Sequence, residues 1–131
     1  MDRLTVNVDG GARGNPGPAA IAAVVRGGGE VLEEVGERIG RATNNVAEYR
    51  ALLLGIERAA ALGASELELV GDSELIVRQV KGEYKVKDPT MRELHAQVKR
   101  ALEPFDRWSI RHVRREHNAD ADRLVNAALD R

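Results

Sequence analysis

The chain has 131 residues, a length that suits one domain with its own buried core. It contains no cysteine, which excludes a disulfide framework and thiolate-bound cofactors and is compatible with the cytoplasmic location that we expect. No apolar run approaches the roughly 18 residues of a membrane span, so we expect no membrane partner. The net charge is −1, yet residues 78–115 carry eleven Lys and Arg against five Asp and Glu, a distribution that could hold a polyanion.

Three strands are predicted in the first third of the chain. Residues 4–9 alternate apolar and polar side chains with the period of a half-buried strand, which puts Asp9 at the end of its polar face. A glycine-rich stretch, residues 10–17, then lets the backbone turn or approach a ligand closely. Residues 19–26 are short and apolar, and residues 30–40 place apolar side chains at even spacing with glutamates between them. Short glycine-rich turns between such strands predict an antiparallel meander.

From residue 43 the apolar period changes to that of a helix, and helices then separate the strands. The expected elements are a helix at 43–62, a strand at 66–72, helices at 73–82 and 91–102, a strand at 108–113 and a helix at 118–129. Helical crossovers connect strands that run parallel. We therefore predict one α/β domain, residues 1–131, built on a five-stranded mixed sheet with antiparallel strands first, parallel strands later and helices on its faces.

Four carboxylates occupy places where this topology could gather ligands. Asp9 and Asp72 end the first and fourth predicted strands, and ligands collect at strand ends in open sheets with crossovers. Glu48 lies in the first turn of the first helix, and Asp122 lies in the first turns of the last helix, beside its apolar face. If the four converged, they would repel one another unless a hard divalent cation such as Mg²⁺ bound them.

Each of these carboxylates also has a structural explanation that needs no ligand. Asp9 could simply open a turn. Glu48 stands three residues after Asn45, which is the spacing of a capping box in which Asn45 caps the helix. Asp72 precedes a serine that could cap the next helix, and Asn118 is a good N-cap for the last one. Taken singly, the segments leave these alternatives open.

Four segments, in this order, resemble the type 1 ribonuclease H family, which cuts the RNA of RNA–DNA hybrids. They are DGGARGNPGPAA at 9–20, TNNVAEYRALLLG at 43–55, VGDSELIVRQVKGEYKV at 70–86 and VRREHNADADRLVNAAL at 113–129. The resemblance spans nearly the whole chain, and four ordered motifs are far more specific than any one of them. It implies the ribonuclease H-like fold and a metal-dependent endonuclease.

The resemblance implies that four carboxylates bind two Mg²⁺ or Mn²⁺ ions, namely Asp9, Glu48, Asp72 and Asp122. A metal-activated water would then attack the RNA phosphate and leave 5′-phosphate and 3′-hydroxyl ends. The resemblance also implies six substrate-binding positions, which are Gly11, Asn15, Arg41, Thr43, Asn44 and Asn45. The two adjacent asparagines match the pair that recognises the hybrid, where side-chain amides could read 2′-hydroxyls.

The chain departs from the family pattern in three places. Many members carry a histidine on a longer loop before the last helix. Here that loop is residues 114–117, and His117 is the candidate for proton transfer or product release, with an exposed loop residue as the alternative. Glu74 stands where a substrate-contacting glutamine is common. The basic helical insertion of some bacterial members is absent from the sequence, which predicts weaker, salt-sensitive hybrid binding.

Two other functions are left open by the sequence. One is a hybrid- or double-stranded-RNA-binding module of the same fold with weak or no turnover, and the presence of all four carboxylates counts against it. The other is a DNA exonuclease, which the TNNVAEY motif disfavours. Some relatives also cut double-stranded RNA. We expect a monomer, and because the family domain occurs both alone and fused to other domains, the chain could be part of a longer protein.

Overall fold

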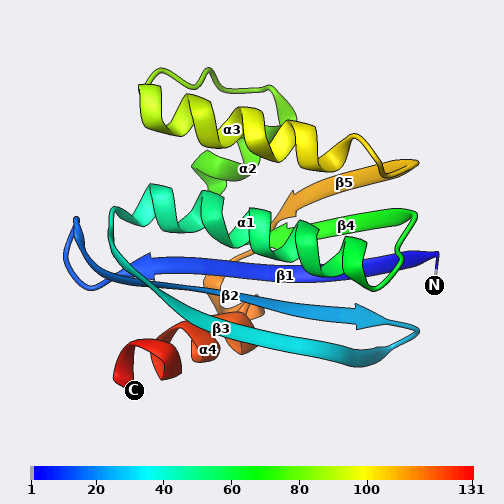
Figure 1. Ribbon diagram of the computed structural model, residues 1–131, viewed down its shortest axis with the longest axis horizontal. Helices are drawn as coiled ribbons and strands as arrows, with labels where there is room; N and C mark the ends of the chain where they lie inside the picture. The colour runs from blue at the N-terminus through cyan, green and yellow to red at the C-terminus, as the bar shows by residue number, and fades with distance from the viewer. Residues whose placement is uncertain (1) are drawn as a thin grey trace.

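A five-stranded mixed sheet forms the centre of the protein, and helices cover both of its faces (Figure 1). The computed structural model describes residues 2–131. In chain order the elements are β1 (Arg3–Ala12), β2 (Gly17–Gly27), β3 (Glu30–Ala42), α1 (Asn44–Ala61), β4 (Glu66–Gly71), α2 (Glu74–Lys81), α3 (Pro89–Leu102), β5 (Arg107–His112), the short 3₁₀ helix η1 (Arg115–His117) and α4 (Ala119–Asp130). The predicted α/β fold on five strands is confirmed.

The strand order is β3-β2-β1-β4-β5, which puts β1 in the middle of the sheet. β1 is antiparallel to β2, whereas β4 runs parallel to both β1 and β5 because helical crossovers separate these strands in the chain. The parallel register runs from Arg3 opposite Glu66 to Asn7 opposite Val70. Residues 9 and 72 each lie two positions beyond this last pair, so the register brings them to the same edge of the sheet.

The sheet separates two apolar clusters of unequal size. Helices α1, α2 and α3 cover one face and enclose the larger cluster, to which β2 contributes Ile21 and Val25. α4 covers part of the other face, where β2 and α4 form a smaller cluster of Ala20, Ala22, Val24, Ala121, Val125 and Ala128. β2 supplies both clusters because successive side chains of a strand point to opposite faces. α4 is therefore held by much less apolar surface than α1.

Side chains cap the first three helices but not the last. Thr43 Oγ1 accepts a hydrogen bond from the Val46 N–H at 3.2 Å, and Ser73 caps α2 in the same way. The alternative in which Asn45 caps the first helix is excluded, because α1 already begins at residue 44 and Thr43 caps it. Asn118 occupies the N-cap position of α4, as the sequence suggested, but its side chain makes no capping bond.

β1 continues past Asp9, where the sequence pattern predicted its end. Residues 10–12 pair with residues 19–21 of β2, because the antiparallel ladder continues after the parallel ladder with β4 has stopped. The turn itself falls later, and Gly14 adopts there a positive φ of 104° that favours glycine. Asp9 therefore lies within a paired strand, with its backbone held on the β2 side.

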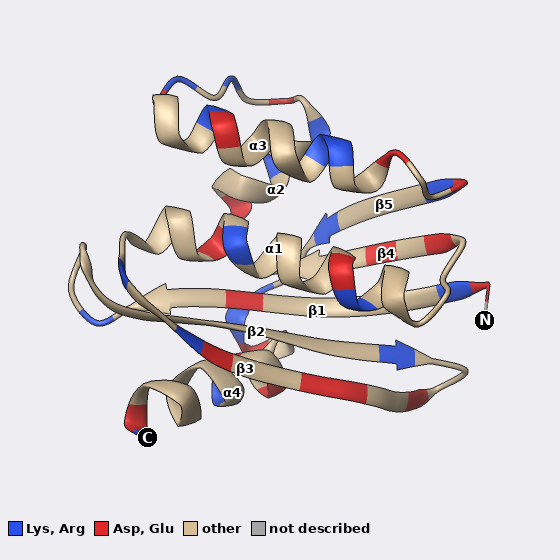
Figure 2. Ribbon diagram, in the orientation of Figure 1, with Lys and Arg blue, Asp and Glu red and all other residues tan. Residues whose placement is uncertain are grey.

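Charged side chains are unevenly distributed over the surface (Figure 2). Acidic residues follow the edge strand β3, whereas basic residues gather in α3, in the segment before it and in β5. This separation matches the charge asymmetry of the sequence. Among residues 2–131, no helix is long and apolar enough to cross a membrane.

Candidate active site

Three carboxylates converge at the edge of the sheet where β1 and β4 end their shared ladder. Asp9 lies on β1, Asp72 directly follows β4, and Glu48 lies one turn into α1. One carboxylate oxygen of each residue lies within 4.8 Å of the other two. Asp9 and Glu48 are only 7% and 9% exposed, so these two donors are largely shielded from solvent. The structure thus brings together three of the residues that the sequence pattern singled out.

Glu48 reaches this cluster because α1 crosses β1 at very short range. The Gly10 N–H donates a hydrogen bond to Glu48 Oε1 at 2.9 Å. A Cβ at residue 10 would lie 2.3 Å from the Ala47 carbonyl oxygen, so only glycine allows the helix to approach the strand this closely. The capping-box explanation of Glu48 is excluded, because its carboxylate bonds to the strand and Thr43 caps the helix.

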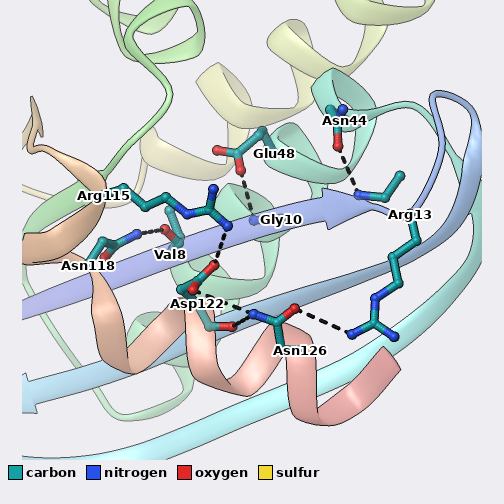
Figure 3. Close-up of polar contacts among 10 residues, drawn as sticks. Val8, Gly10, Arg13, Asn44, Glu48, Arg115, Asn118, Asp122 and Asn126 are labelled. Carbon is teal, nitrogen blue, oxygen red and sulfur yellow. Dashed lines mark hydrogen bonds and ion pairs between the residues drawn. The ribbon is translucent and has the colours of Figure 1, made fainter. Parts of the chain in front are cut away.

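Asp122 approaches the same site from the other side of β1, on the first turn of α4. It lines a cavity of about 570 Å³ together with the three clustered carboxylates. Asp122 Oδ1 accepts a hydrogen bond from Arg115 Nη2 at 3.2 Å, and its main-chain oxygen accepts one from Asn126 (Figure 3). The Asp122 side chain is 29% exposed and that of Arg115 is 76% exposed. The Asp122 carboxylate is therefore more accessible than those of Asp9 and Glu48, and it is already paired with the guanidinium of Arg115.

The first three carboxylates lie where negative charge is costly. Burial, and then the charge of Asp72, raise the pKa of Asp9 to about 7. Burial, and then the charge of Asp9, raise the pKa of Glu48 well above its ordinary range. Burial also raises the pKa of Asp72, although the Asn118 amide and the Arg115 guanidinium oppose this shift. A bound cation would relieve the desolvation and the mutual repulsion of the ionised groups.

This donor set fits a hard divalent cation. All four groups are carboxylates, and three of their oxygens already lie within 4.8 Å of one another. Mg²⁺ and Mn²⁺ prefer such oxygen ligands, whereas softer metals favour the thiolates that this chain lacks. Because the pKa of Asp9 is raised to about 7, this carboxyl keeps part of its protons near neutral pH, and cation binding would release them.

Three of the predicted substrate-binding residues line the cavity. Gly11 lies on β1, and Asn44 and Asn45 form the first turn of α1 beside it. Asn44 Oδ1 accepts a hydrogen bond from the Ala12 N–H at 2.9 Å, which fixes the start of the helix against the strand. Asn44 and Asn45 thus border the cavity next to the acidic cluster.

The other three predicted substrate-binding residues lie beside the cavity and do not line it. Asn15 Oδ1 accepts a hydrogen bond from the Asn44 N–H at 3.0 Å, so it supports the start of α1 from the β1–β2 connection. Arg41 is an exposed residue at the end of β3, with its guanidinium 3.5 Å from the Pro16 carbonyl oxygen. The Thr43 hydroxyl caps α1 by accepting a hydrogen bond from the Val46 N–H. These three positions form a shoulder next to the site.

His117 is not brought to the acidic cluster. It lines a separate cavity with Asn7 and Arg26, which none of the four carboxylates lines. Arg115, two residues earlier, lines the acidic cavity instead. The sequence interpretation missed Arg115, and the signal for it was the shortness of the loop, which leaves few residues between β5 and α4 that can reach Asp122.

The fold and the site define an α/β domain of the ribonuclease H-like class. A family described as reverse transcriptase-like matches residues 7–128. The chain is 47% identical over 129 residues to ribonuclease HI of Halobacterium salinarum, which covers 98% of this chain and 65% of that protein. The crystal structure of the Halobacterium ribonuclease H1 superposes with a TM-score of 0.95 and covers 98% of both chains. The chain belongs to the type 1 ribonuclease H family.

Two further relatives bear on how such domains are used. A bifunctional protein of Mycobacterium tuberculosis is 45% identical over 130 residues, a match that covers 98% of this chain and 36% of the mycobacterial protein. The compost-derived LC11-RNase H1 was solved in complex with an RNA/DNA hybrid, with a TM-score of 0.92, 45% identity and coverage of 97% and 96% of the two chains. The chain thus spans 65% of the length of the Halobacterium protein and 36% of the length of the mycobacterial protein.

Proposed function

We propose that this domain is an endonuclease that hydrolyses the RNA strand of RNA–DNA hybrids. The observation that carries the proposal is the convergence of Asp9, Glu48 and Asp72 within 4.8 Å, in a cavity that Asp122 also lines. The complex of LC11-RNase H1 with an RNA/DNA hybrid supports the choice of substrate, because that protein shares 45% of its residues and the whole fold with this chain.

In this proposal the four carboxylates would hold two Mg²⁺ or Mn²⁺ ions. When bound, such ions would supply an activated water and stabilise the leaving oxygen, which gives 5′-phosphate and 3′-hydroxyl ends. The chain itself fixes the donors: the Gly10 N–H orients Glu48, and the β1–β4 register sets Asp9 beside Asp72. Because Asp9 and Glu48 are shielded from water, their carboxylates act in a medium where charge interactions are strong.

The start of α1 would read the substrate. Asn44, Asn45 and Gly11 border the cavity next to the acidic cluster, and amide groups can both donate to and accept from a 2′-hydroxyl, which distinguishes RNA from DNA. Asn15 and Arg41, on the shoulder beside this segment, would lie near backbone phosphates of the second strand. Hybrid binding should therefore weaken as the salt concentration rises.

The proposal extends to the setting in which the domain works. We infer a monomeric domain that acts in the cytoplasm, in line with a chain that has no cysteine to form a disulfide. The mycobacterial relative is described as bifunctional and is much longer than this chain, which supports a domain that can also work fused to another. Double-stranded RNA is retained as a second candidate substrate.

The test is cleavage of one sequence prepared as RNA–DNA hybrid, as duplex DNA and as duplex RNA, each with Mg²⁺, with Mn²⁺ and with chelator. We expect metal-dependent cutting of the RNA strand of the hybrid and no cutting of duplex DNA. Binding of hybrid without cutting under either metal would refute the nuclease and leave a binding module.

Replacing Asp72 by Asn gives the matching variant. Asp72→Asn removes a negative donor from the cluster but keeps its shape, so the fold should persist while cleavage falls by at least about 10³-fold. Asp106→Asn changes an exposed acid at the opposite edge of the sheet, just before β5, and should leave the rate unchanged. Full activity of Asp72→Asn would remove this residue from the site.

A further inference from the structure

We propose that Asn118 is a positioning residue that fixes Asp122 relative to Asp9, and that it thereby sets how tightly the acidic cluster binds divalent cations. The inference deepens the proposed function and rests on it for the identity of the site. Asn118 lies in the connection between η1 and α4, yet it is only 1% exposed. A buried amide needs partners for its donors and its acceptor, and the partners show what the side chain holds together.

The side chain of Asn118 is bonded to β1 directly before the first catalytic carboxylate. Its Nδ2 donates to the Val8 carbonyl oxygen at 2.9 Å, and its Oδ1 accepts from Asn7 Nδ2 at 3.0 Å (Figure 3 shows the bond to Val8). Val8 immediately precedes Asp9. The ladder between β1 and β4 ends at Asn7. Asn118 therefore hydrogen-bonds to β1 at the point where β1 no longer pairs with β4.

The main chain of Asn118 begins the helical turn that carries the fourth carboxylate. Its carbonyl oxygen accepts a hydrogen bond from the Asp122 N–H at 3.1 Å, while its side chain makes no capping bond. One residue therefore connects Asp122 to the strand that carries Asp9, through its backbone on one side and its amide on the other. An ordinary N-cap would satisfy α4 alone and would leave the distance to β1 unset.

Arg26 forms a second link between β1 and α4, next to that of Asn118. Asn7 Oδ1 accepts a hydrogen bond from Arg26 Nη1 at 2.8 Å, and Arg26 Nη2 pairs with Asp120 Oδ2 at 2.6 Å. The polar chain thus starts at Asn118, crosses β1 and β2, and returns to the first turn of α4. Because α4 rests on only a small apolar cluster, these polar links supply the register that its packing does not.

The test measures cation binding directly. Mn²⁺ would be titrated calorimetrically into metal-free wild-type protein and into Asn118→Ala and Asn118→Leu, the second of which keeps the buried volume. Loss of a residue that orients metal ligands typically weakens metal affinity 10–100-fold, and we expect a loss in this range for both variants. With hybrid as substrate, kcat should fall in parallel and KM should change less than about threefold.

A matched control separates positioning from general stability. Gln79 is another buried amide, 5% exposed, which accepts a hydrogen bond from the Tyr49 hydroxyl away from the acidic cluster. Gln79→Ala should lower the melting temperature about as much as Asn118→Ala does, yet leave Mn²⁺ affinity within twofold. If Asn118→Ala also kept its Mn²⁺ affinity within twofold, the residue would be merely structural and the inference would be overturned.

Arg26→Met keeps the inference testable if both Asn118 variants fail to fold. It removes the outer link and leaves the Asn118 amide in place, so we expect a two- to fivefold loss of Mn²⁺ affinity, with an unchanged affinity counting against the proposal. The titration needs no cleavage. A wild-type protein that binds Mn²⁺ but cuts no hybrid would therefore refute the nuclease function separately from the role of Asn118.

Discussion

Helices α1 and α4 each deliver one carboxylate to the site, but they are held in very different ways. α1 has 18 residues, is capped by Thr43 and lies on the larger apolar cluster, and its Glu48 is bonded to β1. α4 has 12 residues, lacks a side-chain cap and lies on the smaller cluster, and its Asp122 is partly exposed and paired with Arg115. The site thus joins a rigid, buried half to a more accessible half whose geometry depends on polar links.

The largest expected effect is on the α1 half. Gly10→Ala would place a Cβ against the Ala47 carbonyl, at a distance that neither backbone can accommodate without moving. We expect the free energy of unfolding to fall by about 3 kcal/mol, measured by urea denaturation. Gly11→Ala is the matched control, because its Cβ would meet only Val125 Cγ1 at 3.9 Å. An equal loss in both variants would show that α1 is not seated as closely as described.

The second effect is a pH dependence of the stability of the metal-free protein. The pKa of Asp9 is about 7 in the folded state against 3.8 ordinarily, so the folded protein keeps a proton that the unfolded chain has lost. Stability from this group is therefore fully present below about pH 4 and is lost as the pH rises through 7. Unfolding in chelator across this range should show the decline, and saturating Mg²⁺ should reduce it.

Asp9→Asn and Asp122→Asn distinguish the buried half of the site from the accessible half. Asp9→Asn should stabilise the metal-free protein by about 1–3 kcal/mol at pH 8 while abolishing cleavage, because it removes a buried charge. Asp122→Asn should abolish cleavage too but change stability by less than about 0.5 kcal/mol, since the Asp122 side chain is partly exposed. Equal stability changes in the two variants would contradict the division into a buried and an accessible half.

A smaller effect is expected at Arg115. Its guanidinium competes with any cation for Asp122, so Arg115→Ala should tighten Mn²⁺ binding two- to fivefold in a calorimetric titration. The stability should change by less than about 0.5 kcal/mol, because the pair lies near the surface. Weaker Mn²⁺ binding would show instead that Arg115 helps to hold Asp122 in place for the metal.

The smallest effect is expected at His117. It lines a cavity that the four carboxylates do not share, so His117→Ala should cleave hybrid within about twofold of the wild-type rate across pH 6–9. A loss of activity confined to one arm of the pH profile would restore the proton-transfer role that the sequence suggested for this residue.

Most of the architecture could be predicted from local patterns. Alternation in residues 4–9 and the helical period after residue 43 reflect which face of each element is buried, and burial is the dominant constraint on sequence. The sequence left open whether the first and fourth strands are neighbours, and the structure shows them paired in a parallel ladder. Because parallel strands end at one edge, that adjacency was enough to bring Asp9 and Asp72 together.

The details that failed depend on contacts between distant segments. Asn118 has the residue type and position of an N-cap, yet the Asn7 side-chain amide, 111 residues away in the chain, donates to the Oδ1 that a cap would use. The end of β1 was placed too early because the pairing of residues 10–12 is set by β2. Glycines in that stretch suggested a turn, whereas the lack of a side chain at Gly10 allows α1 to approach β1 closely. No local signal distinguishes these cases, since each partner lies elsewhere in the chain.

The small, alanine-rich cluster under α4 affects which part of the protein unfolds first. A helix docked on three short side chains of β2 can detach by a sub-global fluctuation that leaves the other face of the sheet intact. Amide protons of α4 should then exchange with solvent through a lower free energy than those of α1 and β1. On heating, the acidic cluster would come apart before the rest of the fold, so the proposed nuclease activity would be lost before the cooperative melting seen by circular dichroism.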